Sequence, residues 1–283
     1  MHVLYLCVYY IMVINSESSQ SSKSSESLKS SESSKSSESS KSSKKPTIIF
    51  DIDQTLILTD NVSDAVAHNT FEQKTVSYIA HSRTTPSTIV VNIRPGTNEI
   101  IRYLYTHRNK FNIGFWSTGE LEYVNAIVKM LLLNYSDFNI SVLLARRVLP
   151  DGSHKIIDGH TCNLYDYTFV NDIPAKNMKL LFQHPDFKHK FNKNATILID
   201  DLVQNIIINK PKNVVKISGW MAKTHCGALC HLTKWLELNR NQRSFVNLEL
   251  PILDAKYIAN GKRRNLSRKP IRMGGCKKYT KRK

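Results

Sequence analysis

The stretch that decides the fold reads TIIFDIDQTLIL, from Thr47 to Leu58, and it places two acids directly after an apolar run. Its first four residues, up to Phe50, are apolar or β-branched, as expected of a buried strand. Asp51 and Asp53 follow, one residue apart. Because side chains alternate along an extended chain, both carboxylates can face one pocket. Two carboxylates so close repel each other unless one is protonated or a cation lies between them.

Short apolar stretches alternate with amphipathic stretches along the rest of the chain. The expected strands are 47–50, 111–117, 140–145, 195–200 and 213–220, and the expected helices are 97–108, 121–133 and 225–238. Thr97 stands where a helix N-cap is expected. This alternation predicts an α/β fold, a doubly wound parallel sheet covered by helices on both faces. With 283 residues, of which 41% are hydrophobic, the chain can bury such a core.

Polar side chains follow three of the expected strands at the point where each strand ends. Asp51 follows the first, Ser117 closes the second, and Asp200 and Asp201 come at the end of the fourth. Ligands of open parallel sheets bind at the carboxyl ends of the strands, so these side chains are expected to meet. Carboxylate oxygens suit Mg²⁺, and Asp201 would add a third carboxylate to those of Asp51 and Asp53.

A lysine and two hydroxyls would complete a receptor for a phosphoryl group. Lys176 is the candidate for the positive charge, with Lys179 as a nearby rival, and Thr55 and Ser117 offer the hydroxyls. A carboxylate aimed at the phosphorus is a nucleophile and forms an aspartyl phosphate. The second acid would protonate the leaving oxygen and later deprotonate the attacking water, while the cations offset negative charge.

The stretch FDIDQTL resembles the first motif of the HAD-superfamily phosphatases, Asp-x-Asp-x-Thr/Val. RPG at 94–96, followed by FWSTGELEY at 115–123, is similar to the branch that dephosphorylates the C-terminal domain (CTD) of RNA polymerase II. That branch comprises the CTD phosphatase, small CTD phosphatase and NLI-interacting-factor-like family. AKNMKLL (175–181) and ILIDDLVQN (197–205) resemble its later motifs, so that the resemblance covers about Lys45 to Leu238.

The resemblance implies a HAD-like fold and a role for each acid of the first motif. Asp51 would be the nucleophile and a metal ligand. Asp53 would be the general acid and base, with its backbone carbonyl on the metal. Thr55 would position this loop and help to bind the phosphate. Residues 61–92 would form a β-rich insertion between the first two motifs and shape substrate access.

The later motifs supply the remaining roles that the resemblance implies. Ser117 and Lys176 would hold the phosphate, and Tyr123 matches an aromatic residue that follows the second motif. Asp201 would complete the Mg²⁺ shell, and Asp200 would orient the lysine. The sequence departs from the family pattern in STG at 117–119, and also at position 54, which is glutamine. These departures bear on the identity of the substrate more than on the type of reaction.

The function that the motifs imply is a Mg²⁺-dependent phosphatase of phosphoserine or phosphothreonine in an extended protein segment. RNA polymerase II C-terminal repeats are the partner that the resemblance suggests. Two alternatives stay open: the same hydrolase acting on a small metabolite or a nucleic-acid end, and a catalytically weak binding module of the transcription machinery. The expected location is nuclear or cytoplasmic.

Composition divides the chain into three parts: 1–45, a phosphatase domain at 46–240, and a basic tail at 241–283. The first part contains an apolar run, Val3 to Ile14, and a repeat of Ser-Ser-Lys-Ser-Ser-Glu that predicts a disordered linker. The apolar run is shorter than the about 20 residues that span a bilayer, and no Lys or Arg precedes it. A spacer or lead is therefore favoured over a signal or anchor, and no stable membrane insertion is expected.

The formal net charge of +17 is concentrated near the end of the sequence. Twelve Lys or Arg and no Asp or Glu lie between Ala255 and Lys283. Such a segment predicts salt-dependent binding of nucleic acid or another polyanion without sequence preference.

Five cysteines without regular spacing argue against a disulfide framework and favour a reducing compartment. Cys226 and Cys230 in HCGALCH are expected to pack as small hydrophobic residues on a helix rather than to bind a metal.

Overall fold

The fold is described by a computed structural model over most of the segment that carries the motifs. The described residues are 45–61, 71–81, 83–222, 227–245, 248, 250–251 and 253. The predicted apolar lead and serine-rich linker, Cys226, and the basic run after residue 253 lie outside them. Within the described residues, no helix is both long enough and apolar enough to cross a membrane.

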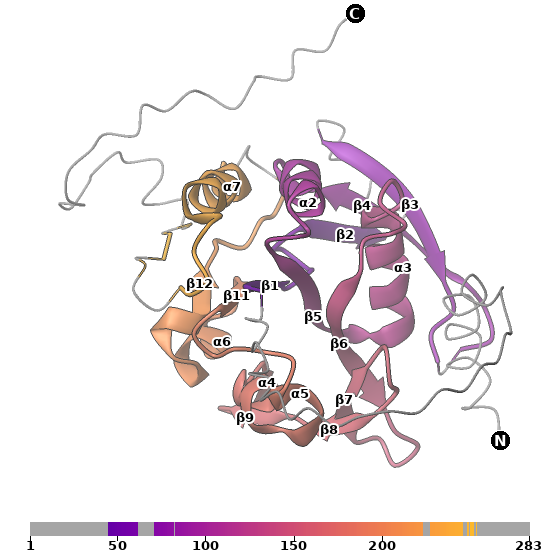
Figure 1. Cartoon of the computed structure of the whole chain (residues 1–283). Coiled ribbons are helices and arrows are strands. Elements are labelled where there is room, and N and C mark those ends of the chain that lie inside the picture. Colours follow the sequence, from indigo (N-terminus) through magenta and orange to yellow (C-terminus); the bar gives the residue numbers. More distant parts are fainter. Residues whose placement is uncertain are drawn as a thin grey trace, which may run out of the picture. The chain divides into compact units, whose positions relative to one another are not determined.

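The centre of the fold is a seven-stranded sheet (Figure 1) with the strand order β12-β11-β1-β5-β6-β7-β8. Its strands are β1 (Thr47–Phe50), β5 (Asn112–Glu120), β6 (Ile140–Val148), β7 (His154–Asp158), β8 (Leu164–Asp166), β11 (Thr196–Asp200) and β12 (Val214–Lys216). The five strands from β12 to β6 are parallel, which confirms the predicted α/β fold. Strands β7 and β8 extend the sheet antiparallel at one edge, which the sequence did not predict.

Helices cover both faces of this sheet, because its central strands are apolar on both sides. The helices are α2 (Thr97–Thr106), α3 (Leu121–Leu131), α4 (Lys179–Gln183), α5 (Pro185–Lys188), α6 (Val203–Ile208) and α7 (Ala228–Asn239). Side chains alternate along β1, so Ile48 and Phe50 pack in the cluster that contains residues of α2, α3 and α7. Ile49 packs on the opposite face, in the cluster that includes Leu181 of α4 and Phe187 of α5.

The start of α2 differs from the prediction. Gly96, not Thr97, is its N-cap, with a φ of 96° that favours glycine. A Cβ at this position would lie 2.9 Å from the Cβ of Leu229 in α7, so the close approach of the two helices also requires glycine. The Thr97 hydroxyl donates instead to the carbonyl of Leu56, at 2.8 Å.

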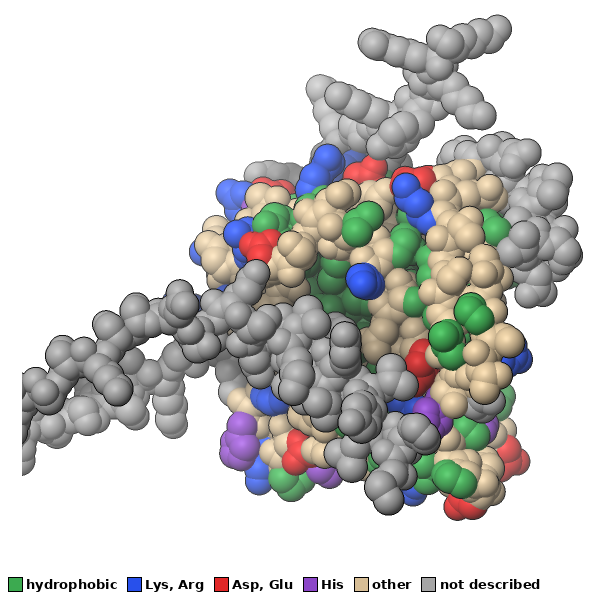
Figure 2. All heavy atoms as spheres, turned by 90° about the vertical axis from the view of Figure 1, so that its right-hand side faces the viewer, with side chains coloured by type: hydrophobic (Ala, Val, Ile, Leu, Met, Phe, Trp, Pro, Cys, Tyr) green, Lys and Arg blue, Asp and Glu red, His purple; other side chains and the backbone are tan. Residues whose placement is uncertain are grey.

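Between the first two motifs lies a three-stranded antiparallel sheet, which confirms the predicted β-rich insertion. It consists of β2 (Ile57–Asn61), β3 (Glu72–Tyr78) and β4 (Ser87–Ile93) in the order β2-β4-β3. Residues 62–70 of the insertion lie outside the described residues. On the molecular face seen in Figure 2, the described hydrophobic, basic and acidic side chains are interspersed.

A short hairpin leads to the predicted site lysine. Strands β9 (Thr168–Val170) and β10 (Ile173–Ala175) pair antiparallel, and Lys176 follows directly. Three-residue strands carry too little periodicity to be read from sequence, so the prediction missed this hairpin.

Residues beyond 240 also pack on the folded part. The side chain of Phe245 is buried, and its amide donates to the carbonyl of Asn194 at 2.7 Å. Leu253 is buried and forms a bridge with Ile217. Cys230 lies half-buried on α7.

Candidate active site

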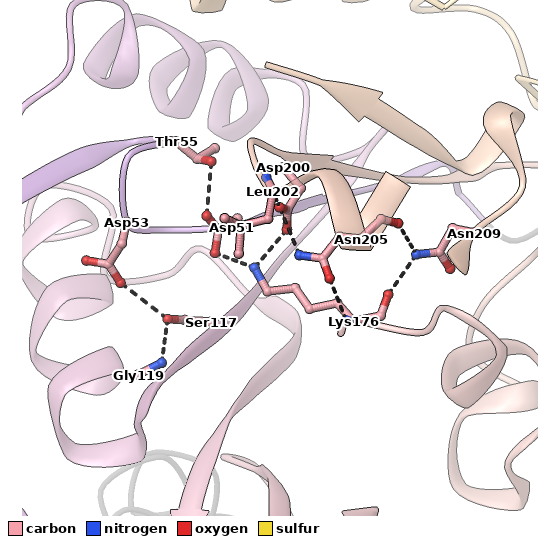
Figure 3. Close-up of polar contacts among 10 residues, drawn as sticks. All are labelled: Asp51, Asp53, Thr55, Ser117, Gly119, Lys176, Asp200, Leu202, Asn205 and Asn209. Carbon is pink, nitrogen blue, oxygen red and sulfur yellow. Dashed lines mark hydrogen bonds and ion pairs between the residues drawn. The ribbon is translucent and has the colours of Figure 1, made fainter. Parts of the chain in front are cut away.

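The loop after β1 places Asp51 at the carboxyl end of the sheet (Figure 3). The Asp51 amide donates to the carbonyl of Ile199, at 2.9 Å, and so continues the pairing of β1 with β11. The chain then turns at Gln54, whose φ is 59°. This turn brings the hydroxyl of Thr55 to 3.0 Å from Oδ2 of Asp51, to which it donates. The Asp51 carboxylate is therefore held in one orientation by its own loop.

Lys176 lies beside Asp51, whereas Lys179 does not. The Lys176 side chain is 0% exposed, and its Nζ donates to Oδ1 of Asp51 and, at 2.8 Å, to Oδ2 of Asp200. Lys179 is exposed at the start of α4. Burial by itself would lower the pKa of Lys176, but the charges of Asp200 and Asp51 raise it overall, so the ammonium keeps its proton.

Three acids gather around this lysine from the ends of two neighbouring strands. One carboxylate oxygen from each of Asp51, Asp200 and Asp201 lies within 4.8 Å of the others. Both oxygens of Asp200 already accept hydrogen bonds, from Lys176 on one side and from the Leu202 amide at 2.8 Å on the other. Asp51 and Asp201 complete an all-oxygen set, which is the kind of ligand set that fits Mg²⁺.

Burial raises the pKa of two of these acids, Asp51 and Asp201. It raises the pKa of Asp51 to about 8, an effect that nearby Lys176 opposes and Asp200 strengthens. It also raises the pKa of Asp201, again with the charge of Asp200 as the next cause. Carboxylates that lie this close repel each other when they are ionised, and a bound dication would offset this repulsion.

Asp53 points away from the three acids, toward the end of β5. Its carboxylate accepts hydrogen bonds from the hydroxyls of Tyr123 and, at 3.5 Å, Ser117. The Ser117 hydroxyl in turn accepts from the amide of Gly119 at 2.9 Å. Burial raises the pKa of Asp53 although Tyr123, Lys176 and Ser117 all act to lower it. The carboxylate of Asp53 is thus outside the acidic cluster, and its part in metal binding would be its backbone carbonyl.

Arg94 is a residue whose part in the site the sequence did not reveal. Its side chain is buried, and its guanidinium donates to the carbonyls of Gln54 and Thr55, at 3.0 and 3.1 Å. The Arg94 amide donates to the carbonyl of Leu56 at 3.0 Å. Arg94 therefore fixes the loop that carries both acids, a role that the resemblance of RPG to the family motif did not specify. A charged residue directly after an apolar strand was a further signal.

The raised pKa of Asp51 predicts how pH and Mg²⁺ act on stability. The unfolded carboxyl loses its proton near its ordinary pKa of 3.8, whereas folded Asp51 keeps it to about 8. The folded protein binds more protons between these values, so this group makes the metal-free protein less stable as pH rises from about 4 to about 8. A dication such as Mg²⁺ would bind the deprotonated acids, and its addition should raise the melting temperature more at about pH 8 than at about pH 6.

Thermal denaturation with and without Mg²⁺ at the two pH values measures this difference. Asp201→Asn should reduce the Mg²⁺-induced shift, and Asp166→Asn, on exposed β8, should leave it unchanged. A shift of equal size at both pH values would contradict the prediction.

Comparisons with known proteins agree with this geometry. The family model for NLI interacting factor-like phosphatases matches residues 46–246. Among curated proteins, none matches this chain.

The similar solved structures include two of the RNA polymerase II CTD phosphatase Fcp1. The fission yeast protein bound to beryllium fluoride is 14% identical, with a TM-score of 0.42 over 71% of this chain and 53% of that chain. A structure described as an essential RNA polymerase II CTD phosphatase is 13% identical, with a TM-score of 0.40 over 73% of this chain and 55% of that chain. The chain spans about half the length of these proteins. From the family match, the chain belongs to the NLI interacting factor-like phosphatases.

Proposed function

We propose that this chain is a Mg²⁺-dependent phosphatase that hydrolyses phosphoserine or phosphothreonine in an extended protein segment. The observation that carries the proposal is the placement of the Asp51 carboxylate, which lies between the hydroxyl of Thr55 and the buried ammonium of Lys176. A carboxylate oriented in this way, beside a permanent positive charge, is suited to attack a phosphate and to form an aspartyl phosphate.

In the first half of the reaction, an oxygen of Asp51 attacks the phosphorus, and the bond from phosphorus to the ester oxygen breaks. Asp53 gives its proton to that oxygen, so the serine or threonine side chain leaves as a neutral alcohol. The raised pKa of Asp53 suits this step, because a general acid must carry a proton near neutral pH. The Lys176 ammonium offsets negative charge on the transferred oxygens, and the Ser117 hydroxyl binds one of them.

In the second half, water attacks the phosphorus of the aspartyl phosphate while Asp53 takes up its proton. The bond from phosphorus to the Asp51 oxygen breaks, which releases inorganic phosphate and restores both carboxyls. Mg²⁺ held by Asp51, Asp201 and the backbone carbonyl of Asp53 would neutralise negative charge shared by the carboxylates and the phosphate.

The insertion supports a substrate that reaches the site as part of a longer segment. The ring of Tyr78 in β3 packs edge-on against that of Tyr123, with 5.6 Å between the centroids. Tyr123 itself binds Asp53, so the insertion borders the acid that would protonate the leaving group. A peptide would therefore contact the insertion as well as the acids, and phosphorylated repeats of the RNA polymerase II type are the proposed partner class.

Phosphate release from a panel of substrates tests the proposed specificity. The panel contains phosphoserine, phosphothreonine and phosphotyrosine peptides and a mononucleotide, each with Mg²⁺ and with EDTA. We expect Mg²⁺-dependent release with kcat/KM at least about tenfold higher for the phosphoserine and phosphothreonine peptides than for the other two. A preference for the nucleotide would instead identify a hydrolase of small phosphate esters, and equal rates in EDTA would contradict the role of the metal.

A further inference from the structure

We propose that Asn205 and Asn209 are positioning residues that hold Lys176 against Asp51. This inference rests on the proposed phosphatase function, because Lys176 is the group that would neutralise the transferred phosphate. The two asparagines are four residues apart, Asn205 within α6 and Asn209 as its C-cap. Residues at this spacing lie on one side of a helix, and both side chains reach the chain around Lys176 (Figure 3).

Asn205 connects Lys176 with the acid that binds it. Its side chain is fully buried. Its Oδ1 accepts the backbone amide of Lys176 at 2.7 Å, and its Nδ2 donates to Oδ1 of Asp200 at 2.9 Å. The other oxygen of Asp200 accepts from the Lys176 ammonium. Asn205 therefore fixes the backbone amide of Lys176 directly and its side-chain ammonium through Asp200.

Asn209 binds the peptide groups that follow. Its Nδ2 donates to the carbonyl of Lys176 at 2.7 Å, and also to that of Asn205 at 2.6 Å. Its Oδ1 accepts the amide of Met178 at 2.8 Å. Together the two amides bind the backbone on both sides of the lysine Cα, which leaves the backbone around Lys176 little freedom to move.

The backbone from Lys176 to Met178 needs such support because it belongs neither to the strand before it nor to the helix after it. Strand β10 ends at Ala175, and α4 begins at Lys179. The amides of Lys176 and Met178 therefore find their acceptors in asparagine side chains rather than in a strand or helix. Since α6 begins at Val203, two residues after Asp201, the helix that follows the acids also sets the position of the lysine. A displacement of about 1 Å at a catalytic group can cost about a hundredfold in rate.

Kinetics of Asn205→Ala compared with Asn213→Ala test the proposal. Asn213 is a matched control, because it is also a buried asparagine, and its Nδ2 donates to the carbonyls of Lys193 and Thr196, at 2.6 and 2.8 Å. Thr196 starts β11, so this control lies at the end of the strand opposite Asp200. We expect Asn205→Ala to lower kcat by about tenfold to a hundredfold with little change in KM. Asn213→Ala should lose comparable thermal stability and keep the wild-type kcat.

Hydrogen exchange at two backbone amides provides a readout that does not depend on turnover. In the wild type, the amides of Lys176 and Met178 should be protected. Asn205→Ala should release the amide of Lys176, and Asn209→Ala should release that of Met178, while Asn213→Ala should leave both protected.

Several results would overturn the inference while leaving the phosphatase proposal intact. One is a wild type that turns over substrate while Asn205→Ala matches Asn213→Ala in kcat. Another is an unchanged exchange rate at both amides in the Asn205 and Asn209 variants. If the wild type is inactive but the two amides lose protection in the asparagine variants as expected, only the phosphatase function is rejected. The role of the asparagines in positioning the lysine would stand.

Discussion

Replacement of Asp51 by asparagine is expected to abolish phosphate hydrolysis, with kcat lowered by at least about 10³-fold. The amide has nearly the shape of the carboxylate, so its oxygen can still accept from Lys176 while its NH₂ group donates to the hydroxyl of Thr55. It lacks the negative charge and the nucleophilic oxygen that the reaction requires. The loss should therefore appear in turnover and not in folding, and the variant should melt at or above the wild-type temperature because a buried acid has been removed.

Turnover of p-nitrophenyl phosphate with Mg²⁺ measures the effect without dependence on the natural substrate. Asp166→Asn is the matched control, because the side chain of Asp166 is 84% exposed on β8 and its activity should equal that of the wild type. Beryllium fluoride, a mimic of aspartyl phosphate, should bind to the wild type and not to Asp51→Asn, as seen by fluorine NMR. Retained turnover in Asp51→Asn, or a beryllium fluoride adduct on another carboxylate, would reject Asp51 as the nucleophile.

The meeting of Asp51 with Asp200 and Asp201 was predictable, because the carboxyl ends of parallel strands lie at one edge of a sheet. The period of two along an extended chain was a poorer guide, because the carboxylate of Asp53 points away from these acids and accepts from Tyr123. Asp200 and Asp201 reach this edge because Ile199, the residue before them, pairs with Phe50, the residue before Asp51. The apolar strands and the acids that follow them are visible in the residues themselves, without knowledge of packing.

The supports of the site were not predictable, because they join segments that are far apart in sequence. Arg94 holds carbonyls that lie about 40 residues earlier, and Asn205 holds an amide 29 residues earlier. No local pattern marks an arginine that binds carbonyls or an asparagine that binds an amide. The choice between Lys176 and Lys179 likewise depended on the β9–β10 hairpin, whose three-residue strands give no periodic signal.

Replacement of Lys176 by methionine is expected to impair both stability and activity. Methionine has a similar length but no charge, so Asp51 and Asp200 would face each other in the protein interior without a counter-ion. Removal of one partner of a buried ion pair costs about 3–5 kcal/mol, and we expect a fall of this size in the free energy of unfolding of the metal-free protein. Turnover should fall by at least about a hundredfold, because the charge on the transferred oxygens would no longer be offset.

Denaturant unfolding at two pH values distinguishes this cause from loss of packing. At about pH 8 wild-type Asp51 begins to lose its proton beside Lys176, whereas without the ammonium this acid must stay protonated, so the destabilisation by Lys176→Met should be larger there than at about pH 6. Saturating Mg²⁺ should restore part of the lost stability, because a dication neutralises the same acids. Lys179→Met is the control, and as an exposed site it should change the free energy of unfolding by less than about 0.5 kcal/mol. An equal loss at both pH values, or an equal loss in Lys179→Met, would mean that Lys176 does not act as the counter-ion of Asp51.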